Sequence, residues 1–177
     1  IMEQNSEWGG RCLVDFPFVN EEPGLKYISR ILSELRKYKN VTMRSRMMGA
    51  GVYDHGYLLG YERLNDHLST NEGPRHRLWR IRAKQIITAT GAIERPLSFP
   101  GNDIPGIMLA SAVRDYATNF GVAVGDKVAI FTNNDDAYRT AITLHEIGVT
   151  VPVIIDARSG GGGELAHQAK ELGIRVE

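Results

Sequence analysis

A short apolar run that ends in a turn of small residues is the stretch of this chain best suited to binding a ligand. Residues 85–89 read Gln-Ile-Ile-Thr-Ala and are followed by Thr90-Gly91-Ala92. β-branched residues before a breaker predict a short buried strand over 85–89. Gly91 then permits a positive φ and the close approach of another group. Open α/β sheets bind ligands at the carboxyl ends of their strands, so we interpret this turn as a ligand-binding turn, with an ordinary strand end as the alternative.

A second turn, over residues 132–137, lies where a nucleotide's phosphates bind in a doubly wound unit. The phosphate-binding turn reads Gly-x-Gly-x-x-Gly or Ala, whereas this chain reads Thr132-Asn133-Asn134-Asp135-Asp136-Ala137. Side chains replace both turn glycines, and two acids stand at the helix N-terminus, where the helix dipole favours negative charge. We therefore interpret residues 133–136 as structural caps and predict that no second nucleotide binds here.

The remaining chemistry-bearing residues form no recognisable site. The five histidines lack metal-ligand spacing with cysteine or acids, and no set of residues suggests a nucleophilic triad. Asp156 ends a predicted strand where a ribose-binding acid would lie, but the matching glycines are replaced. Gly160–Gly163 follows the second strand of its unit, so a flexible loop is favoured over a phosphate cradle. We predict neither a metal site nor a catalytic residue in this chain.

The composition of the 177 residues excludes several classes of protein. The 21 Lys and Arg residues equal the 21 Asp and Glu residues, so no basic excess indicates nucleic acid or an anionic membrane as a partner. Cys12 is the one cysteine, which excludes an intrachain disulfide and fits a reducing, cytoplasmic location. No run is long enough to span a bilayer, and no signal peptide is recognisable. Both chain ends read as strand tails, so we expect a piece of a longer protein.

Apolar spacing predicts a βαβ arrangement in the first part of the chain. Residues 1–3 and 41–43 read as strands, and residues 20–23 read as a helix start with Asn20 as its capping side chain. Short strands separated by turn residues predict an antiparallel β-meander over about 44–82. The intervening helix is expected to bury the face that carries Leu25, Ile28, Leu32 and Leu35.

Helices and strands alternate in the second part, which predicts a second doubly wound unit. We expect a helix over 109–120 that buries Leu109, Val113, Tyr116 and Phe120, and then, in order, a strand over 127–131, a helix over 135–147, a strand over 149–155 and a helix over 164–172. The fold class is therefore α/β. Residues 1–96 form a partial, Rossmann-like first dinucleotide-binding domain with the inserted meander, 97–125 are a connecting turn and helix, and 126–177 form a partial second domain with a degenerate glycine loop.

Several segments of the chain carry a family resemblance: Trp79–Lys84, Ala89–Leu97, Pro105–Arg114 and Phe131–Arg139, together with Tyr53-Asp54-His55 and Asp66-His67-Leu68. They closely resemble the alpha subunit of heterotetrameric sarcosine oxidase. The resemblance covers nearly the whole chain, and the Thr-Asn-Asn-Asp-Asp turn is its most specific part. It implies a flavoprotein-like fold with two dinucleotide domains, followed by a folate-binding, aminomethyltransferase-like part.

The resemblance also implies an oxidoreductase activity for the assembled complex. The family oxidatively demethylates sarcosine to glycine, and hydrogen peroxide and either formaldehyde or methylene-tetrahydrofolate are the other products. It implies NAD on the intact subunit, FAD and FMN in the intact complex, and tetrahydrofolate in a further domain. Its partners are the other subunits of the heterotetramer, without nucleic acid or membrane. The family's first strand and Gly-x-Gly-x-x-Gly loop are absent from this sequence, so we expect the 177 residues alone to bind no cofactor and to be inactive.

Position by position, the resemblance assigns cofactor binding to Glu3, Gly10, Met48, Gly49, Thr90 and Gly91. Glu3 would accept hydrogen bonds from the ribose hydroxyls, and Gly10 would let the backbone approach the cofactor. The alternative function is a subunit of an opine or amine dehydrogenase, or an NAD(P)H-dependent flavoprotein reductase with paired nucleotide-binding domains. A reductase should keep glycines where this chain has Thr132 and Asn134. A non-enzymatic interaction module is the third alternative.

Overall fold

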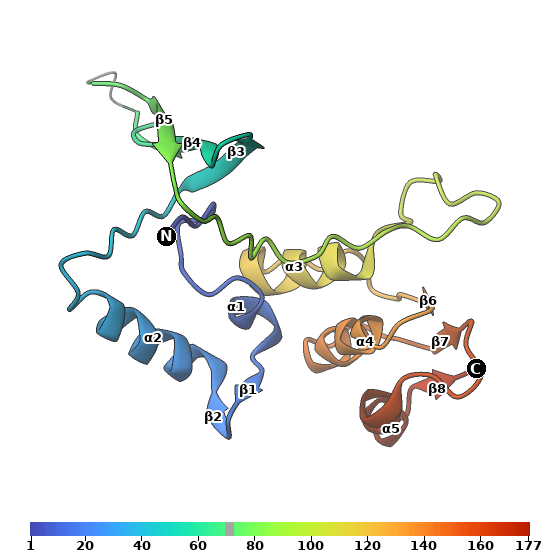
Figure 1. The fold of residues 1–177 in the computed structure, drawn as a ribbon. Coiled ribbons are helices and arrows are strands. Elements are labelled where there is room, and N and C mark those ends of the chain that lie inside the picture. Colours follow the sequence, from blue (N-terminus) through green and yellow to red (C-terminus); the bar gives the residue numbers. More distant parts are fainter. Residues whose placement is uncertain (70–72) are drawn as a thin grey trace. The chain divides into compact units, whose positions relative to one another are not determined.

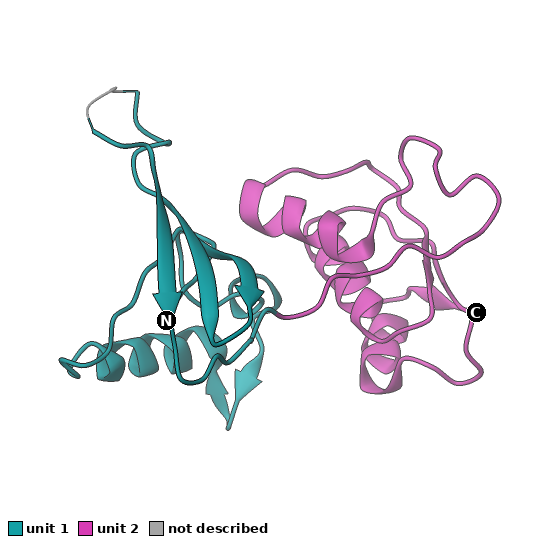
Figure 2. Cartoon of the chain, turned by 45° about the horizontal axis from the view of Figure 1, so that its top comes forward, with its two compact units in different colours: residues 1–90 teal, residues 91–177 magenta. Residues whose placement is uncertain are grey.

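The chain folds into two units, residues 1–90 and residues 91–177, in a computed structural model that describes residues 1–69 and 73–177 (Figure 2). The division falls between Thr90 and Gly91 rather than after Pro96. Helix α3 (Ala110–Phe120), which we predicted to lie in a connection, is part of the second unit. Each unit is described separately below, and Figure 1 labels its elements.

Parallel backbone pairing at the start of the first unit is limited to one bridge, between Met2 and Arg44. The Glu3 N–H donates to the Arg44 carbonyl at 2.9 Å, and the Arg44 N–H donates to the Ile1 carbonyl at 3.0 Å. Helix α2 (Gly24–Leu35) lies between the two paired segments in sequence, as a βαβ unit requires. The strand predicted over 1–3 is reduced to a bridge at Met2, and the strand predicted over 41–43 is not found, because the residue that pairs with Met2 is Arg44, directly after it.

A small hairpin precedes α2 and replaces the helix cap that we predicted. Helix α1 (Cys12–Asp15) leads into strands β1 (Phe18–Val19) and β2 (Glu22–Pro23). Asn20 and Glu21, the two residues between the strands, have φ of 48° and 64°, and positive φ at both positions is typical of a type I′ hairpin turn. Asn20 is thus held in the turn, no described side chain caps α2, and the Gly24 N–H donates to the Pro17 carbonyl at 2.7 Å.

The helix face predicted to be buried in α2 is only partly covered. Ile28, Leu32 and Leu35 are half-buried, and Leu25 is exposed. The spacing therefore located the helix correctly, but the extent of burial was overestimated for Leu25.

Strands β3 (Met47–Tyr53), β4 (Tyr57–Arg63) and β5 (His76–Arg82) form the antiparallel meander that the sequence predicts for this segment. Glu62 is buried on one face of the sheet, beside Met47 and Leu58. The Trp79 Nε1–H donates to Glu62 Oε2 at 2.7 Å. Arg44 and Arg77 pair with the same carboxylate at 3.7 and 3.5 Å, so the buried charge is compensated.

The buried strand predicted over residues 85–89 is wrong. The segment that follows β5 is extended but belongs to no strand, and Ile87 is 91% exposed. A buried strand needs neighbours that take up its N–H and C=O groups, and none of the described strands pairs with this run.

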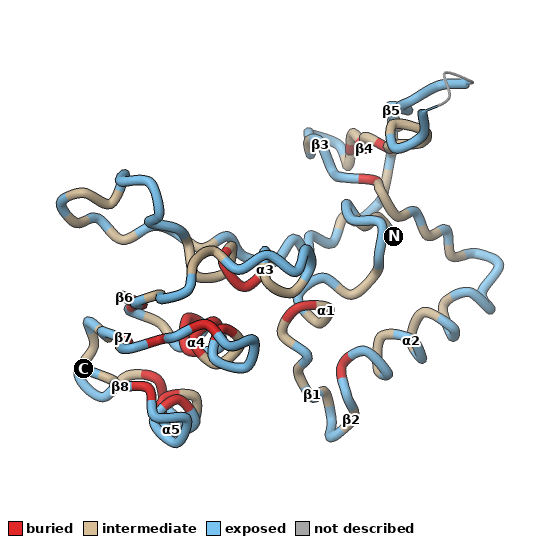
Figure 3. Tube along the Cα trace, turned by 180° about the vertical axis from the view of Figure 1, so that it is seen from behind, coloured by how far each residue is buried: buried red, intermediate tan, exposed pale blue. Residues whose placement is uncertain are grey.

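In the second unit, strands β6 (Ile130–Thr132), β7 (Val153–Asp156) and β8 (Arg175–Val176) form a parallel sheet in that order. Helices α4 (Asp136–Glu146) and α5 (Gly163–Glu171) connect them. The buried residues gather along α4 and α5 (Figure 3). The central side chains of this core are Tyr138, Ala141, Leu144, Ile154 and Ala169, all fully buried. The predicted order of helices and strands is found, with shorter strands.

Helix α3 packs on α4 through a face that includes Val113 of the predicted face but not Tyr116 or Phe120. Val113 and Arg114 are buried, whereas Tyr116 and Phe120 are exposed. Arg114 determines this orientation, because its guanidinium donates to Asp136 Oδ2 at 2.7 Å and to Thr140 Oγ1 at 3.1 Å in the first turns of α4. A charged residue on the inner face is not expected from apolar spacing alone.

Candidate functional site

The carboxyl ends of β6 and β7 form one edge of the parallel sheet in the second unit. Thr132 at the end of β6 is paired with Asp156 at the end of β7. The N-terminus of α4 follows the first strand, and the loop 157–162 follows the second. Ligands bind at such an edge in open α/β sheets, so we treated it as one of two candidate sites.

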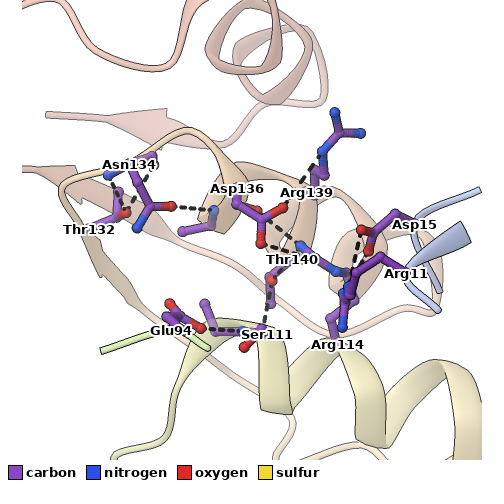
Figure 4. Close-up of polar contacts among 12 residues, drawn as sticks. Arg11, Asp15, Glu94, Ser111, Arg114, Thr132, Asn134, Asp136, Arg139 and Thr140 are labelled. Atoms are coloured by element: carbon purple, nitrogen blue, oxygen red, sulfur yellow. Dashed lines mark hydrogen bonds and ion pairs between the residues drawn. The ribbon is translucent and has the colours of Figure 1, made fainter. Parts of the chain in front are cut away.

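In the turn between β6 and α4, backbone N–H groups donate hydrogen bonds to side chains of the turn itself (Figure 4). The Asn134 N–H donates to the buried Thr132 Oγ1 at 3.0 Å. The Ala137 N–H donates to Asn134 Oδ1 at 3.3 Å, which makes Asn134 the capping side chain of α4. Two amides of the kind that hold a phosphate at a helix N-terminus are therefore already engaged.

Asp135 and Asp136 do not cap their own helix, contrary to our prediction. Asp135 Oδ1 accepts hydrogen bonds from Arg158 Nη2 at 2.6 Å and from the Gly162 N–H at 3.0 Å. Asp136 pairs with Arg114 (Figure 4). Guanidinium groups offer charge-assisted bonds that are stronger than those of neutral amides, which explains why both carboxylates turn toward arginines.

Asp156, Arg158 and Tyr138 complete a polar cluster at this edge. Arg158 Nε and Nη2 donate to the two oxygens of Asp156 at 3.0 and 2.8 Å, and the Tyr138 hydroxyl donates to Asp156 Oδ2 at 2.8 Å. The hydrogen bond from Arg158 lowers the pKa of Asp156 to about 2. Burial and then the bond to Asp156 raise the pKa of Tyr138 to about 12. Neither group changes its protonation state near pH 7, so the pair is suited to stabilising the fold and not to general acid–base catalysis.

The glycine loop packs against this cluster. A Cβ at Gly161 would overlap the carboxylate of Asp156, and one at Gly162 would overlap the ring of Tyr138. Gly162 also has a φ of 90°, which disfavours any other residue. The glycines thus permit a close approach to the protein's own side chains, a role that the sequence analysis missed. The sequence feature that could have indicated this role is Arg158, which follows the strand-end Asp156 by two residues and can pair with it.

In the first unit, three of the predicted cofactor-binding residues lie together. The Met47 N–H donates to the Glu3 carbonyl at 2.8 Å, which places Glu3 beside the start of β3, where Met48 and Gly49 follow. Glu3 is half-buried, and its Oε1 accepts a hydrogen bond from the Asn5 N–H at 2.9 Å. An acid in this position fits the ribose hydroxyls of a dinucleotide.

The other three predicted residues are not joined to this group by any described hydrogen bond. Gly10 has a φ of 51° and no atom within 4 Å of a Cβ position, and its carbonyl accepts a hydrogen bond from the Leu13 N–H at 3.1 Å. Thr90 is the last residue of the first unit, and Gly91, with a φ of 71°, is the first residue of the second. Glu3, Met48 and Gly49 thus lie together in the first unit, whereas side chains of the chain occupy the sheet edge of the second unit.

Residues 1–69 and 73–177 contain no group of three or more His, Cys, Asp and Glu side chains that could hold a metal ion. None of their helices combines the length and the apolar character needed to cross a membrane.

Three known proteins similar to this chain in sequence are named sarcosine oxidase subunit alpha. No family model matches the chain. The sarcosine oxidase subunit alpha of Rhizobium meliloti (strain 1021) is 37% identical over 172 residues, 96% of this chain. The proteins of the same name from Corynebacterium sp. strains U-96 and P-1 are 43% and 38% identical over 85% and 89% of it. This chain spans 17%, 16% and 16% of these relatives. The resemblance seen in the sequence is confirmed.

A solved structure supports the fold class. The crystal structure of L-proline dehydrogenase from P. horikoshii matches 88% of this chain with a TM-score of 0.64, at 22% identity and over 30% of its own length. At that identity the match shows the fold alone, and it agrees with the α/β class that the sequence predicts.

Proposed function

Because nearly the whole chain aligns with part of sarcosine oxidase alpha subunits, we propose that it is the cofactor-binding and scaffold portion of such a subunit. The similarity to three proteins of that name carries the proposal. The assembled, cytoplasmic complex would demethylate sarcosine oxidatively to glycine, with hydrogen peroxide and formaldehyde or methylene-tetrahydrofolate as further products. FAD and FMN would supply the redox chemistry, and tetrahydrofolate would accept the one-carbon unit, in parts of the complex outside these 177 residues.

Within this chain, we assign NAD binding to the first unit. Glu3 would accept hydrogen bonds from the ribose hydroxyls beside Met48 and Gly49, and Gly10 would allow the backbone to approach the cofactor. Thr90, the last residue of the first unit, and the directly following Gly91 would contribute to the same site at the end of that unit. The second unit would act as a framework, in keeping with the closed polar cluster at its sheet edge.

The test of the overall function uses the full-length protein, purified with the subunits encoded beside it. Oxygen uptake and peroxide release with sarcosine are expected, with no comparable turnover of NAD(P)H. Oxidation of an opine or another amine without oxidation of sarcosine would favour a dehydrogenase subunit instead. NAD(P)H-dependent flavin reduction would favour a reductase.

The assignment of Glu3 has its own test. Glu3→Gln in the full-length protein removes the charge from hydrogen bonds that contribute about 1.5–3 kcal/mol each, and the amide still accepts one of them. We expect about tenfold weaker NAD binding without a change in melting temperature. Glu7→Gln changes a nearby exposed acid and serves as the matched control. Equal NAD content in wild type and Glu3→Gln would contradict the assignment.

A further inference from the structure

The segment that carries Glu3 is held by hydrogen bonds along its backbone. Each carbonyl over residues 3–5 accepts one: Glu3 from the Met47 N–H at 2.8 Å, Gln4 from Arg63 Nη2 at 2.7 Å, and Asn5 from the Arg46 N–H at 2.8 Å. The Glu3 side chain is held as well, because its Oε1 accepts the Asn5 N–H at 2.9 Å. The position of the Glu3 carboxylate therefore depends on how the backbone at residues 46–47 is placed.

Arg46 has a backbone conformation that is uncommon for a residue with a Cβ. Its φ of 56° lies in the left-handed region, which is unfavourable for L-residues other than glycine. Successive N–H groups of a regular strand point to opposite sides, but the left-handed residue breaks this alternation, and the N–H groups of Arg46 and Met47 both donate to the segment 3–5. Such conformations persist where surrounding contacts impose them, and they cluster at ligand-binding sites.

Asp66 and Arg63 supply the contacts that hold Arg46. Arg46 Nη2 donates to Asp66 Oδ1, and Arg46 Nε donates to the Arg63 carbonyl at 3.2 Å. The Arg46 carbonyl accepts the Arg63 N–H at 2.9 Å. Each side chain of the pair between Arg46 and Asp66 is 23% exposed, so solvent and salt screen it less than a surface pair. Asp66 begins one of the segments that resemble the family, Asp66-His67-Leu68, to which the proposed function assigns no role.

We propose that Asp66 is a positioning residue for the cofactor site. Through Arg46 it would hold the backbone that places the Glu3 carboxylate at the ribose hydroxyls of NAD, without touching NAD itself. This inference rests on the proposed binding of NAD by the first unit. If Asp66 acts through Glu3, its removal weakens NAD binding only while Glu3 is present, whereas a general loss of stability would weaken binding in either background.

The first test is a double-mutant cycle in the full-length protein, purified with the subunits encoded beside it. Asp66→Ala removes the carboxylate and keeps the carbonyl that accepts Arg75 Nη2 at 3.1 Å. We expect NAD affinity, measured by titration calorimetry, to fall about tenfold in Asp66→Ala and to fall no further when Asp66→Ala is added to Glu3→Ala. Asp54→Ala removes an exposed acid from the turn between β3 and β4 and should bind NAD as the wild type does.

The second test separates the conformation of Arg46 from its charge. Arg46→Gly and Arg46→Ala both lose the guanidinium, but glycine adopts a φ of 56° without strain. We therefore expect Arg46→Gly to bind NAD several-fold more tightly than Arg46→Ala, and Asp66→Ala to cause no additional loss in Arg46→Gly.

The outcomes distinguish this inference from the NAD assignment. Equal NAD affinity in Arg46→Gly and Arg46→Ala would overturn the positioning role. Wild-type affinity in Asp66→Ala would do so too, as would a full additional loss when Asp66→Ala is combined with Glu3→Ala. Wild-type affinity in Glu3→Ala would instead overturn the assignment of NAD to Glu3, and the positioning role would fall with it.

Discussion

Replacing Arg158 by alanine should loosen the second unit at the carboxyl edge of its sheet. The guanidinium joins three parts of that unit: the end of β7 through Asp156, the start of α4 through Asp135, and, by way of Asp135, the Gly162 amide before α5. Alanine keeps the backbone N–H that donates to Asp156 Oδ1 at 3.0 Å, so the change removes the side-chain contacts alone.

The expected loss can be worked out from these contacts. The bond to the exposed Asp135 contributes about 0.2–1 kcal/mol, as surface ion pairs do. The two bonds to Asp156 involve a carboxylate whose side chain is 4% exposed, and hydrogen bonds to charged groups contribute about 1.5–3 kcal/mol each. Arg158 is itself 36% exposed, and Asp156 keeps the Tyr138 hydroxyl, so solvent and that bond offset much of the loss. We expect a net destabilisation of about 2 kcal/mol, or roughly a 30-fold larger opening equilibrium.

The effect should depend on pH in a defined direction. Arg158 holds the pKa of Asp156 at about 2, below the ordinary value of 3.8. A carboxyl with a lowered pKa in the folded state stabilises the fold fully above its unfolded pKa and loses that contribution as the pH falls through the folded value. The difference between wild type and Arg158→Ala should therefore be constant from pH 7 to about pH 5 and should shrink between about pH 4 and pH 2.

Hydrogen exchange measured on peptides from α4 and α5, corrected for intrinsic rates, reports the opening of this unit directly. Arg139→Ala is the matched control, because Arg139 makes only an exposed pair with Asp136 at 3.8 Å. Protection in Arg158→Ala equal to that in Arg139→Ala would refute the reasoning, and so would a difference that does not diminish at low pH.

Substitutions at three further positions test other parts of the fold. Glu62→Gln weakens the buried bond from Trp79, so we expect a loss of about 1 kcal/mol in the meander and a shifted tryptophan emission; unchanged emission would contradict this. Arg114→Met removes the hydrogen bonds to Asp136 Oδ2 and Thr140 Oγ1 but leaves an Asp136 side chain that is 53% exposed and stays hydrated, so we expect a loss of about 1–2 kcal/mol for the second unit in urea unfolding; no measurable loss would show that the contacts are dispensable. Asn134→Ala should cost about 1 kcal/mol in the same assay and Asn134→Gly less, and equal costs would argue against capping.

The second unit was more predictable from sequence than the first, and the reason is local. Its core helix α4 carries small and apolar residues at helical spacing, and Gly148 and Gly173 end the predicted helices, so periodicity and breakers agree. In the first unit, the run at 85–89 has the composition of a buried strand, but pairing partners decide whether a strand forms. Asn20 shows the same limit on a smaller scale, because one residue type suits both a helix cap and a type I′ turn.

The candidate sites were predictable only in part. The replaced glycines of the 132–137 turn indicated that side chains occupy this edge, and Thr132 and Asn134 do so. The partners of Asp135 and Asp136 were not predictable, because Arg158 and Arg114 are distant in sequence and reach them through the packing of other elements. Glu3 was placed by resemblance, and its position beside β3 depends on a single parallel bridge that no local pattern reveals.

At the sheet edge of the second unit, side chains of the chain accept the hydrogen bonds of the backbone amides. This bears on how many nucleotides the whole protein would hold. The amides of Asn134, Ala137 and Gly162 each donate to a side chain of this chain, so a pyrophosphate would have to displace three hydrogen bonds. It would also approach Asp135 and Asp156, and each pair of like charges costs about 4 kcal/mol at ~4 Å and an effective dielectric of ~20. Arg158 offsets part of this repulsion, but both carboxylates already use its guanidinium. These contacts disfavour a phosphate at this edge, in keeping with our proposal that NAD binds at the first unit.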